Sequence, residues 1–345
     1  MTPGGGDPGA VSLGRRIGVA AAGAAVPLLL VLLFVLLWSL WTFNGPGPAA
    51  AAGRSTDVIL RPGARLPEIA AALRRAHVIG SDAVFVAAAE VTGSAHLLKA
   101  GEYDFASRAS MARVMAAIRD GRVVRHFVTI PEGTTSQGVI DTLTRADFLS
   151  GVAPVPPEGA VLPETYEVLR GQDRSAVLQR MMDARDKLLA DLWTRRRDGL
   201  PYQNPDQAVI LASIIEKETA KPDERPRIAA VFVNRLGKNM RLESDPTVIY
   251  GLTQGRPLGH GLKASELAAP SPYNTYLLAG LPPTPIANPG RAALAAALDP
   301  PRTDDLYFVA DGTGGHVFSA SFEEHRKNVA RWRAIELARA AGLPR

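Results

Sequence analysis

Two glutamates stand at the end of a strongly apolar stretch, in the segment VILASIIEKET at 209–219. On a helix, side chains three and four positions apart share a face. Glu218 would therefore lie over Ile214 and Ile215, and Glu216 over smaller side chains. A carboxyl group against aliphatic side chains is penalised for ionising, so its pKa rises and it can hold a proton near neutral pH. The pattern predicts a general acid at Glu218.

The two glutamates admit another interpretation. A Glu-Lys-Glu trio at the end of a helix is commonly a solvated surface feature without a catalytic role. The apolar run continues up to the carboxylates, however, and this indicates a helix inside the domain. Ionisable side chains are seldom placed there without a partner or a task. We therefore favour the catalytic interpretation and keep Glu216 as the alternative acid.

A second group of residues combines amides, hydroxyls, aromatic rings and a guanidinium. Such groups bind carbohydrate through hydrogen bonds and stacking, and Arg can pair with carboxylates on an acidic glycan. Turn formation and packing explain each residue equally well when it is taken singly. His316, in a predicted hairpin, is a further candidate for substrate contact, with turn packing as its alternative. The group consists of Asn234, Arg235, Asp245, Thr247, Tyr250, Tyr273, Asn274, Thr275 and Tyr276.

The chain offers little for metal or covalent chemistry. It has no cysteine, which excludes disulfides, thiolate nucleophiles and cysteine-ligated metals. Its six histidines form no HxxxH or HxH pair, and neither a phosphate-binding loop nor a Gly-x-Ser-x-Gly elbow is present. The formal charge of +5 is not concentrated in a basic run, which argues against nucleic acid as a partner. We expect no metal site and no cofactor.

The elements that must position these residues are predicted from periodicity. A long amphipathic helix over 174–195 begins the second domain, and the glutamate-bearing helix spans 207–219. Beyond Pro246 the many prolines and glycines predict a loop-dominated segment, and binding and catalytic groups tend to sit on such loops. A hairpin over 306–318 and a final helix over 322–341 complete the chain.

A smaller α+β region comes first. Two similar units, each a strand, a turn and a helix, begin near residues 58 and 128 and suggest a duplicated module. Prolines and glycines over 151–162 mark a boundary, so we predict domains at 57–150 and 151–345. Between the two units the predicted elements are a helix over 82–91, a turn and strand over 98–105, and a helix over 110–119 that Gly121 ends.

The N-terminal region predicts a membrane anchor. No charged residue occurs from Ile17 to Gly53, and roughly 20 apolar residues suffice to span a bilayer. We predict a cytoplasmic tail at 1–16, a transmembrane helix at 17–43 and a linker at 44–56. Two arginines before the helix and aromatic residues near its end favour an N-terminus inside and the remainder outside. A cleaved signal peptide is the alternative, disfavoured by the length of the apolar stretch.

Six strings in the second domain resemble the successive signature blocks of the MltG (YceG-like) family of endolytic murein lytic transglycosylases. One such block could arise by chance, but six in order are specific. The first domain is similar to the family's LysM-like region through ILRPG, LKAGEYDF and VTIPEGTT, a weaker match. The six strings are ASIIEKET at 212–219, FVNRL at 232–236, RLESDPTVIYG at 241–251, SPYNTY at 271–276, GLPPTPIANPG at 280–290 and LYFVADGTGGHVF at 306–318.

The resemblance implies an α+β fold in three parts. These are an N-terminal transmembrane helix, a LysM-like α+β module and a mixed α/β catalytic domain with long Pro/Gly-rich loops. It also implies a single-pass protein of the plasma (inner) membrane, with a cytoplasmic N-terminus and a catalytic part that is periplasmic or otherwise extracytoplasmic. The implied partners are peptidoglycan glycan strands and the peptidoglycan synthases known as penicillin-binding proteins.

The resemblance further implies a reaction. A lytic transglycosylase cleaves the β-1,4 bond between N-acetylmuramic acid and N-acetylglucosamine in nascent strands, leaves 1,6-anhydro ends, and so terminates glycan polymerisation. The catalytic glutamate of the family, carried over by position in ASIIEKET, falls on Glu218. Two alternatives stay open: a non-catalytic peptidoglycan-binding scaffold, and a hydrolytic muramidase in which Asp245 supplies the second carboxylate that hydrolysis ordinarily needs.

Overall fold

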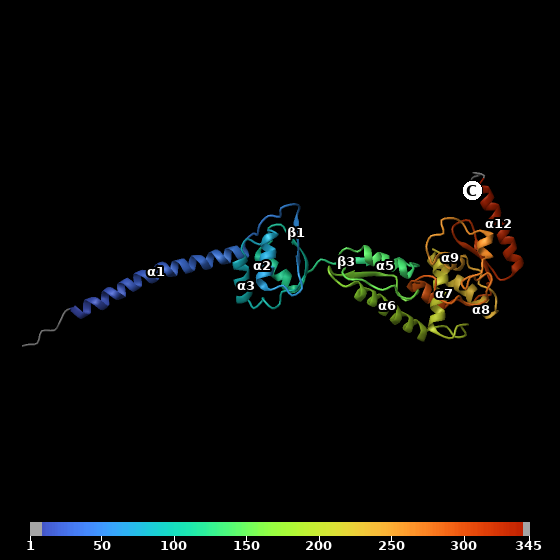
Figure 1. Ribbon diagram of the computed structural model, residues 1–345, viewed down its shortest axis with the longest axis horizontal. Coiled ribbons are helices and arrows are strands. Elements are labelled where there is room, and N and C mark those ends of the chain that lie inside the picture. The colour runs from blue at the N-terminus through green and yellow to red at the C-terminus, as the bar shows by residue number, and fades with distance from the viewer. Residues whose placement is uncertain (1–8, 341–345) are drawn as a thin grey trace, which may run out of the picture. The chain divides into compact units, whose positions relative to one another are not determined.

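The structure, a computed structural model, describes the backbone of residues 9–340 and the side chains of residues 27–339. It divides into two compact units, residues 1–125 and 126–345, and each contains its own hydrophobic core (Figure 1). Residues 1–8 of the predicted cytoplasmic tail lie outside the described residues.

The first helix of unit 1 is long and apolar. α1 (Gly9–Asn44) contains the predicted span, and its part Pro27–Asn44 is long and apolar enough to cross a membrane, with no side chain buried. A signal sequence would share these properties. The structure therefore contains one N-terminal helix that is a candidate membrane anchor, within the part of the chain that it describes.

Unit 1 folds around a two-stranded antiparallel sheet. β1 and β2 pair from Ser55 opposite Ala106 to Leu60 opposite Gly101. Serines cap α3 and α4, and Gly121, in the left-handed region at φ 72°, ends α4 as predicted. After α1 the elements are β1 (Ser55–Leu60), α2 (Leu66–Arg75), α3 (Asp82–Val91), β2 (Gly101–Ala106) and α4 (Met111–Asp120).

The predicted linker at 44–56 is not a free tether. The backbone N–H of Gly47 donates to the carbonyl of Arg108 at 3.2 Å, and that of Arg108 donates to the carbonyl of Pro48 at 3.0 Å. The N–H of Ala50 donates to Ser107 Oγ at 3.0 Å. Because backbone groups near a folded surface gain partners wherever they can, the Pro- and Gly-rich segment runs along the turn after β2.

Unit 2 begins with a small α+β layer. β3 and β4 form an antiparallel pair from His126 opposite Val168 to Thr129 opposite Thr165, with α5 and α6 beside it (Figure 1). Its core is an apolar cluster that includes Val128, Val139, Leu143, Val177 and Met181. The elements of this layer are β3 (His126–Thr129), α5 (Ser136–Arg145), β4 (Thr165–Val168) and α6 (Arg174–Thr194).

The boundary between the units differs from the predicted one. We placed it near residue 150, whereas the compact units divide after Arg125. The reason is long-range pairing, because β3 lies before the predicted boundary and its partner β4 lies after it. Both predicted strand-turn-helix units are present, but β1 with α2 and β3 with α5 belong to different units.

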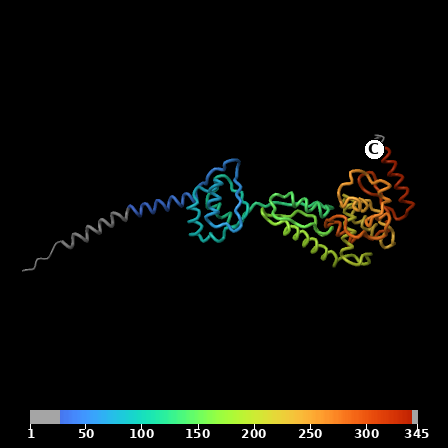
Figure 2. Tube along the Cα trace, viewed as in Figure 1, coloured from blue at the N-terminus to red at the C-terminus, as the bar shows by residue number. Residues whose placement is uncertain are grey.

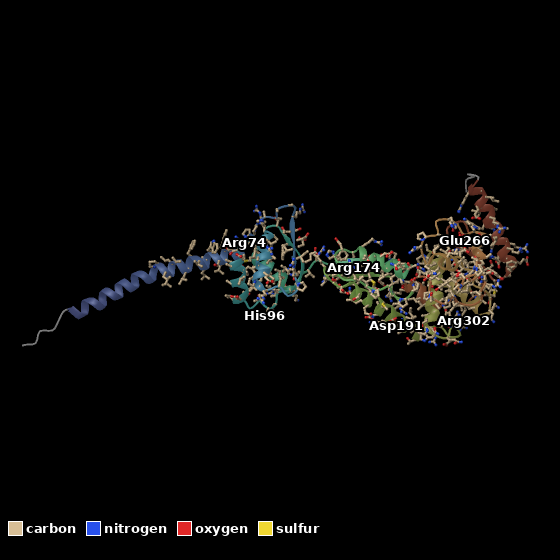
Figure 3. The ribbon with its side chains drawn as sticks, viewed as in Figure 1. Arg74, His96, Arg174, Asp191, Glu266 and Arg302 are labelled. Atoms are coloured by element: carbon tan, nitrogen blue, oxygen red, sulfur yellow. The ribbon has the colours of Figure 1, made fainter. Side chains whose placement is uncertain are left out.

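Arg174 joins the two helices of this layer (Figure 3). It lies at the start of α6, and its guanidinium donates to the carbonyls of Leu143, Ala146 and Gly151 at 2.7–2.8 Å. These carbonyls belong to the last turn of α5 and the segment after it, where no intrahelical donor remains. The arginine therefore caps α5 and fixes where the chain enters α6.

The rest of unit 2 is a helical core with a hairpin on it. α7 packs against α8 and α11, and their apolar side chains, among them Leu211, Ile214, Phe232 and Leu294, are fully buried. The elements are α7 (Pro205–Glu218), the 3-10 turn η1 (Pro222–Glu224), α8 (Arg225–Gly237), α9 (Asp245–Thr253), α10 (Ala264–Leu267), α11 (Arg291–Leu298), β5 (Tyr307–Ala310), β6 (His316–Ser319) and α12 (Phe322–Ala340).

The segment beyond Pro246 is less irregular than predicted. Its loops, orange in Figure 2, lead into α11, whose sequence RAALAAAL packs in the middle of the core. We missed this helix because the dense prolines and glycines around it predict loops, and an alanine-rich stretch has no clear apolar face. The predicted hairpin and final helix are present as β5, β6 and α12.

Candidate active site

α7 carries Glu218 to the edge of the core. Asn204 caps the helix by accepting from the N–H of Gln207 at 3.0 Å, and the side chains from Ala208 to Ile215 are buried. The helix ends at Glu218 because Thr219 is extended, with φ −140° and ψ 136°. A rigid, buried helix thus delivers one carboxyl group at its last residue.

The carboxyl group of Glu218 is held in a poorly solvated place. Burial is the main cause that raises its pKa, to about 7, and the charge of Asp245 adds to the rise. The hydroxyl of Ser244 donates to Glu218 Oε1 at 2.5 Å, and this bond and the charge of Arg235 lower the pKa. Burial outweighs both, so the carboxyl group is poised to give and take a proton near neutral pH.

The side chain of Glu218 lines a cleft with a volume of about 470 Å³. Its polar lining comes from α7, α8, the loop before α9, the first residue of α9, the loop after α10, and α12. Phe308 of β5 and Val329 of α12 supply apolar wall. The polar lining residues are Glu218, Arg235, Glu243, Asp245, Tyr276 and His325. A cleft with aromatic, hydroxyl and charged groups around one protonatable carboxyl suits a sugar polymer.

Three of the predicted substrate-binding residues line this cleft. Tyr276 donates its hydroxyl to Asp245 Oδ1 at 2.6 Å, which joins the two side chains on one wall. Burial is the first cause that raises the pKa of Tyr276, followed by its bond to Asp245, so the phenol stays neutral. Arg235 also lines the cleft, and its guanidinium lies 5.2 Å from the centroid of the Tyr307 ring.

Arg235 is held by several hydrogen bonds within the protein. Its guanidinium donates to the carbonyl of Leu306 at 2.7 Å and to those of Arg241 and Leu242 at 3.0 Å. It also pairs with Glu243 at 3.0 Å, and the residue is only 7% exposed. Arg235 therefore organises the cleft wall through its Nε and Nη1 atoms.

Four of the predicted residues are used inside the protein. Asn234 donates to the carbonyls of Thr303 and Asp305, and Asn274 to those of Leu267 and Ala269. The hydroxyls of Thr247 and Thr275 lie 2.9 Å apart, and Thr275 Oγ1 accepts from the N–H of Ser244 at 3.0 Å. These contacts fix the loops around Glu218.

The other three predicted residues lie away from this lining. Tyr250 packs edge-on against Tyr273 at 5.0 Å between ring centroids, and their hydroxyls contact Glu158 and Thr284. His316 holds Glu224 through its Nδ1 at 2.7 Å and its N–H at 3.0 Å. Of the described residues that line the cleft with Glu218, none is Tyr250, Tyr273 or His316.

Glu216, the alternative acid, sits in a structural ion pair. Its carboxylate is 2.9 Å from Arg225, which also pairs with Glu132 at 3.1 Å, and it accepts from the N–H of Gly290 at 2.9 Å. Burial raises its pKa, while Gly290 and Arg225 oppose the rise. The side chain is 3% exposed and does not line the cleft that holds Glu218, among the described residues.

Sequence reasoning missed three polar residues at the site: two that line the cleft, Glu243 and His325, and Ser244, which binds Glu218. Ser244 and Glu243 precede Asp245 in RLESDPTVIYG, so their position beside it was the available signal. His325 on α12 gave no signal of spacing. Its Nδ1 is buried without a hydrogen-bond partner among the described residues, and burial lowers its pKa, so the ring is neutral near neutral pH.

Comparison with known proteins gives concordant results. The endolytic murein transglycosylase of Streptococcus pneumoniae is 29% identical over 317 residues, which cover 78% of this chain and 56% of that protein. The protein of the same name from Bacillus subtilis is 36% identical over 191 residues, 54% of this chain and 51% of that protein. The chain thus spans about half the length of these curated relatives.

A solved structure and a family model complete the comparison. The crystal structure of a protein described as yceG-like, from Listeria monocytogenes, has 29% sequence identity and a TM-score of 0.49, and the match covers 80% of this chain and 99% of that one. The model of the YceG-like family matches residues 58–331, from β1 to the middle of α12. This match takes in well over half of the sequence, and the chain belongs to the YceG-like family.

Proposed function

We propose that this protein is an endolytic murein lytic transglycosylase that cuts peptidoglycan glycan strands between N-acetylmuramic acid and N-acetylglucosamine. The observation that carries the proposal is the carboxyl group of Glu218, with a pKa of about 7, in a cleft lined by aromatic, hydroxyl and charged side chains. The printed names of the relatives, endolytic murein transglycosylase, support the same activity.

The geometry supports a two-stage proton transfer. Protonated Glu218 gives its proton to the glycosidic oxygen as the bond from that oxygen to the muramyl anomeric carbon breaks. The six-position hydroxyl of the same muramyl residue then attacks the anomeric carbon, and ionised Glu218 takes its proton. The products are a strand with a free N-acetylglucosamine four-position hydroxyl and a strand with a 1,6-anhydromuramyl end, and the acid is restored without consuming water.

Hydrolysis is the competing chemistry. Asp245 lies in the same cleft, and a hydrolytic glycosidase ordinarily uses two carboxylates. In this structure Asp245 is engaged by the hydroxyl of Tyr276, and its charge serves to raise the pKa of Glu218. We therefore assign Asp245 a positioning role, and products with reducing ends instead of anhydro ends would reverse that assignment.

Glu218→Gln tests the acid directly. Glutamine keeps the size and the hydrogen-bond acceptor for Ser244 but cannot give a proton, so cleavage should fall by at least about 100-fold. The measurement is mass spectrometry of glycan strands incubated with the protein, counting anhydro ends. Glu216→Gln is the comparison variant: it loses one of the two hydrogen bonds that its separate carboxylate oxygens accept from Arg225 and Gly290, but it leaves the proton donor Glu218 in place, so the folded variant should retain most of the cleavage. Full activity in Glu218→Gln would overturn the assignment.

The same variant has a stability signature. The pKa of Glu218 is raised from 4.5 to about 7 in the folded state, so its contribution is present below pH 4.5 and is lost as pH rises through 7. At pH 8 the free energy of unfolding of Glu218→Gln should therefore exceed that of the wild-type protein by about 2 kcal/mol, a value already reduced for solvent screening. The two proteins should converge near pH 4, and a pH-independent difference would contradict a buried acid.

The anchor belongs to the proposal as well. We infer that α1 holds the protein in the plasma membrane with its N-terminus inside and both units outside, where peptidoglycan lies. The apolar stretch Pro27–Asn44 and the arginines at 15 and 16 before it support this orientation. Protease added to spheroplasts, whose plasma membrane is intact and whose outer layers are removed, should digest unit 2, and protection of unit 2 would contradict the orientation.

Two further roles rest on the family resemblance. The compact α+β fold of unit 1 supports a LysM-like module that holds the glycan, and an envelope enzyme acting on nascent strands suggests a penicillin-binding protein as partner. Such a partnership would make the protein a terminase of glycan polymerisation. A pull-down from solubilised membranes should recover a synthase, and its consistent absence would count against the partnership.

A further inference from the structure

A second groove lies in unit 2 beside the catalytic cleft. It has a volume of about 320 Å³, with apolar walls from α9 and the segment before α11, among them Ile249 and Ile286. At one edge of the groove the backbone of Gly255 lies close to Thr135. Gly255 has φ +82°, and a Cβ there would lie 2.1 Å from Thr135 Cγ2. Only glycine fits where the chain passes so near the turn before α5.

The groove shares a wall with the cleft. Glu218 lines the cleft and Lys217, the residue before it, lines the groove. In the same way Asp245 lines the cleft and Pro246, the next residue, lines the groove. Consecutive Cα atoms are about 3.8 Å apart. The two cavities therefore lie on either side of the same two short stretches of backbone.

The two cavities have opposite charge. The cleft carries three carboxyl groups, on Glu218, Glu243 and Asp245, and its one arginine is already paired with Glu243. The groove is lined by no carboxylate and by two cations, Lys217 and Arg256. Such a pair of cavities sorts a branched ligand by charge, with an anionic branch excluded from the cleft and attracted to the groove.

Both cations are free to bind. Lys217 and Arg256 are exposed, and neither has an ion pair among the described residues, although Lys217 Nζ lies 3.5 Å from the carbonyl of Gly133. The hydroxyl of Tyr250, another lining residue, is turned to Glu158. The free ionic groups of the groove are thus a lysine, which acts as a point charge, and an arginine, which can bind a carboxylate in two places.

We propose that this groove binds the carboxylate-bearing branch of the muramyl residue while the sugar backbone occupies the cleft. The inference rests on the proposed function, because the substrate must be a muramyl glycan. Each muramyl residue carries a lactyl group whose carboxyl is either free or extended by a short peptide with its own carboxylates. Lys217 and Arg256 would then set which strands the enzyme takes, without touching the bond that breaks.

The test is a binding measurement in the Glu218→Gln background, which removes cleavage. Lys217→Gln with Arg256→Gln is compared with Lys238→Gln with Arg302→Gln, two exposed cations of unit 2 that line neither cavity (Figure 3 labels Arg302). The probes are three soluble glycan fragments. One carries stem peptides, one carries the same peptides with their carboxylates converted to amides, and one is stripped to the free lactyl group.

The double variant Lys217→Gln with Arg256→Gln should bind the peptide-bearing fragment about tenfold more weakly, as expected for the loss of two partly screened charge contacts. Its affinity for the amidated fragment should be unchanged. The control double variant, Lys238→Gln with Arg302→Gln, should bind both fragments as the Glu218→Gln protein does. A similar loss on the stripped fragment would show that the groove accepts the free lactyl carboxylate as well as a peptide carboxylate, and no loss there would restrict the ligand to the peptide. Either result supports the groove as a carboxylate site.

Equal losses on the amidated and peptide-bearing fragments, or none on any carboxylate-bearing fragment, would overturn the inference. So would failure of the Glu218→Gln protein to bind any fragment. These results are separable from the proposed function, which stands or falls on anhydro ends released by the wild-type protein. Cleavage without charge-dependent binding would leave the transglycosylase and remove the groove from its mechanism.

Discussion

Glu218 obtains its protonation behaviour from a balance among three neighbours. Burial and the charge of Asp245 raise its pKa, whereas the bond from Ser244 and the charge of Arg235 lower it. A general acid works best when its pKa lies near the working pH, because it can then both give and accept a proton within one turnover. The site therefore needs the opposing neighbours as much as it needs the burial.

The balance predicts opposite shifts for two adjacent substitutions. Since the acid must be protonated at the start, activity should fall above pH 7, where Glu218 ionises. Ser244→Ala removes a bond that favours the charged form, so this alkaline limb should move to higher pH. Asp245→Asn removes a repelling charge but keeps an acceptor for Tyr276, so the limb should move to lower pH. Each shift should be about half a pH unit to one unit.

The measurement is the pH dependence of kcat/KM on soluble strands, read from the position of the limb and not from its height. Arg291→Gln, a substitution in the exposed ion pair with Glu164, is the control and should leave the limb in place. Movement of both variants in the same direction would show that Glu218 is not the group that titrates.

At the scale of elements, one ion-pair network fixes the helix that carries the acid. Arg225 at the start of α8 joins Glu216 near the end of α7 to Glu132 in the turn after β3, and Gly290 before α11 donates to the same Glu216. Four parts of the chain thus come together around Glu216, two positions before Glu218 on the same helix. The pair is largely buried, so removing one partner leaves the other charge without compensation.

Arg225→Met should therefore destabilise unit 2 by about 3 kcal/mol, because the carboxylate of Glu216 would be left buried and unpaired. The measurement is the free energy of unfolding in urea. Arg291→Met, in an exposed pair with Glu164, should cost less than about 1 kcal/mol. Adding Glu216→Gln to Arg225→Met should recover much of the loss, and a strictly additive double variant would argue against coupling between the two.

At the scale of the whole molecule, the segment after α1 is part of unit 1. Its backbone hydrogen bonds reach Ser107 and Arg108, beside the end of β2. Arg108 adopts φ 62°, a left-handed conformation that a non-glycine residue holds only with support from its surroundings. The segment therefore supplies that support as well as connecting the helix to the sheet.

Two truncations separate these roles. A protein that lacks residues 1–44 keeps the hydrogen bonds in which Gly47, Pro48 and Ala50 take part. A protein that lacks residues 1–53 has lost them. At about 1 kcal/mol for each bond, the shorter protein should lose roughly 2 to 3 kcal/mol of stability in unit 1. Faster hydrogen exchange at the β2 amides would report it. Equal protection in the two proteins would show that the segment is only a connector.

Local features of the sequence predicted most of the elements. α3 runs from Asp82 to Val91 and α4 stops at Gly121, as expected, because helical periodicity and capping depend on neighbours within a few residues. The face of α7 that holds Glu218 over apolar side chains follows from the same short-range geometry. The acid could accordingly be chosen from the spacing of residues in one segment.

Only the tertiary structure decided which polar groups remain free for a ligand. Asn234 and Thr247 carry suitable chemistry, but their side chains are engaged by residues far away in the sequence. The pairing of β3 with β4, and the meeting of Ser244 with Glu218, join residues that are more than twenty positions apart. Sequence spacing fixes periodicity along one element, whereas the satisfaction of donors and acceptors depends on which distant elements pack together, and packing alone sets that.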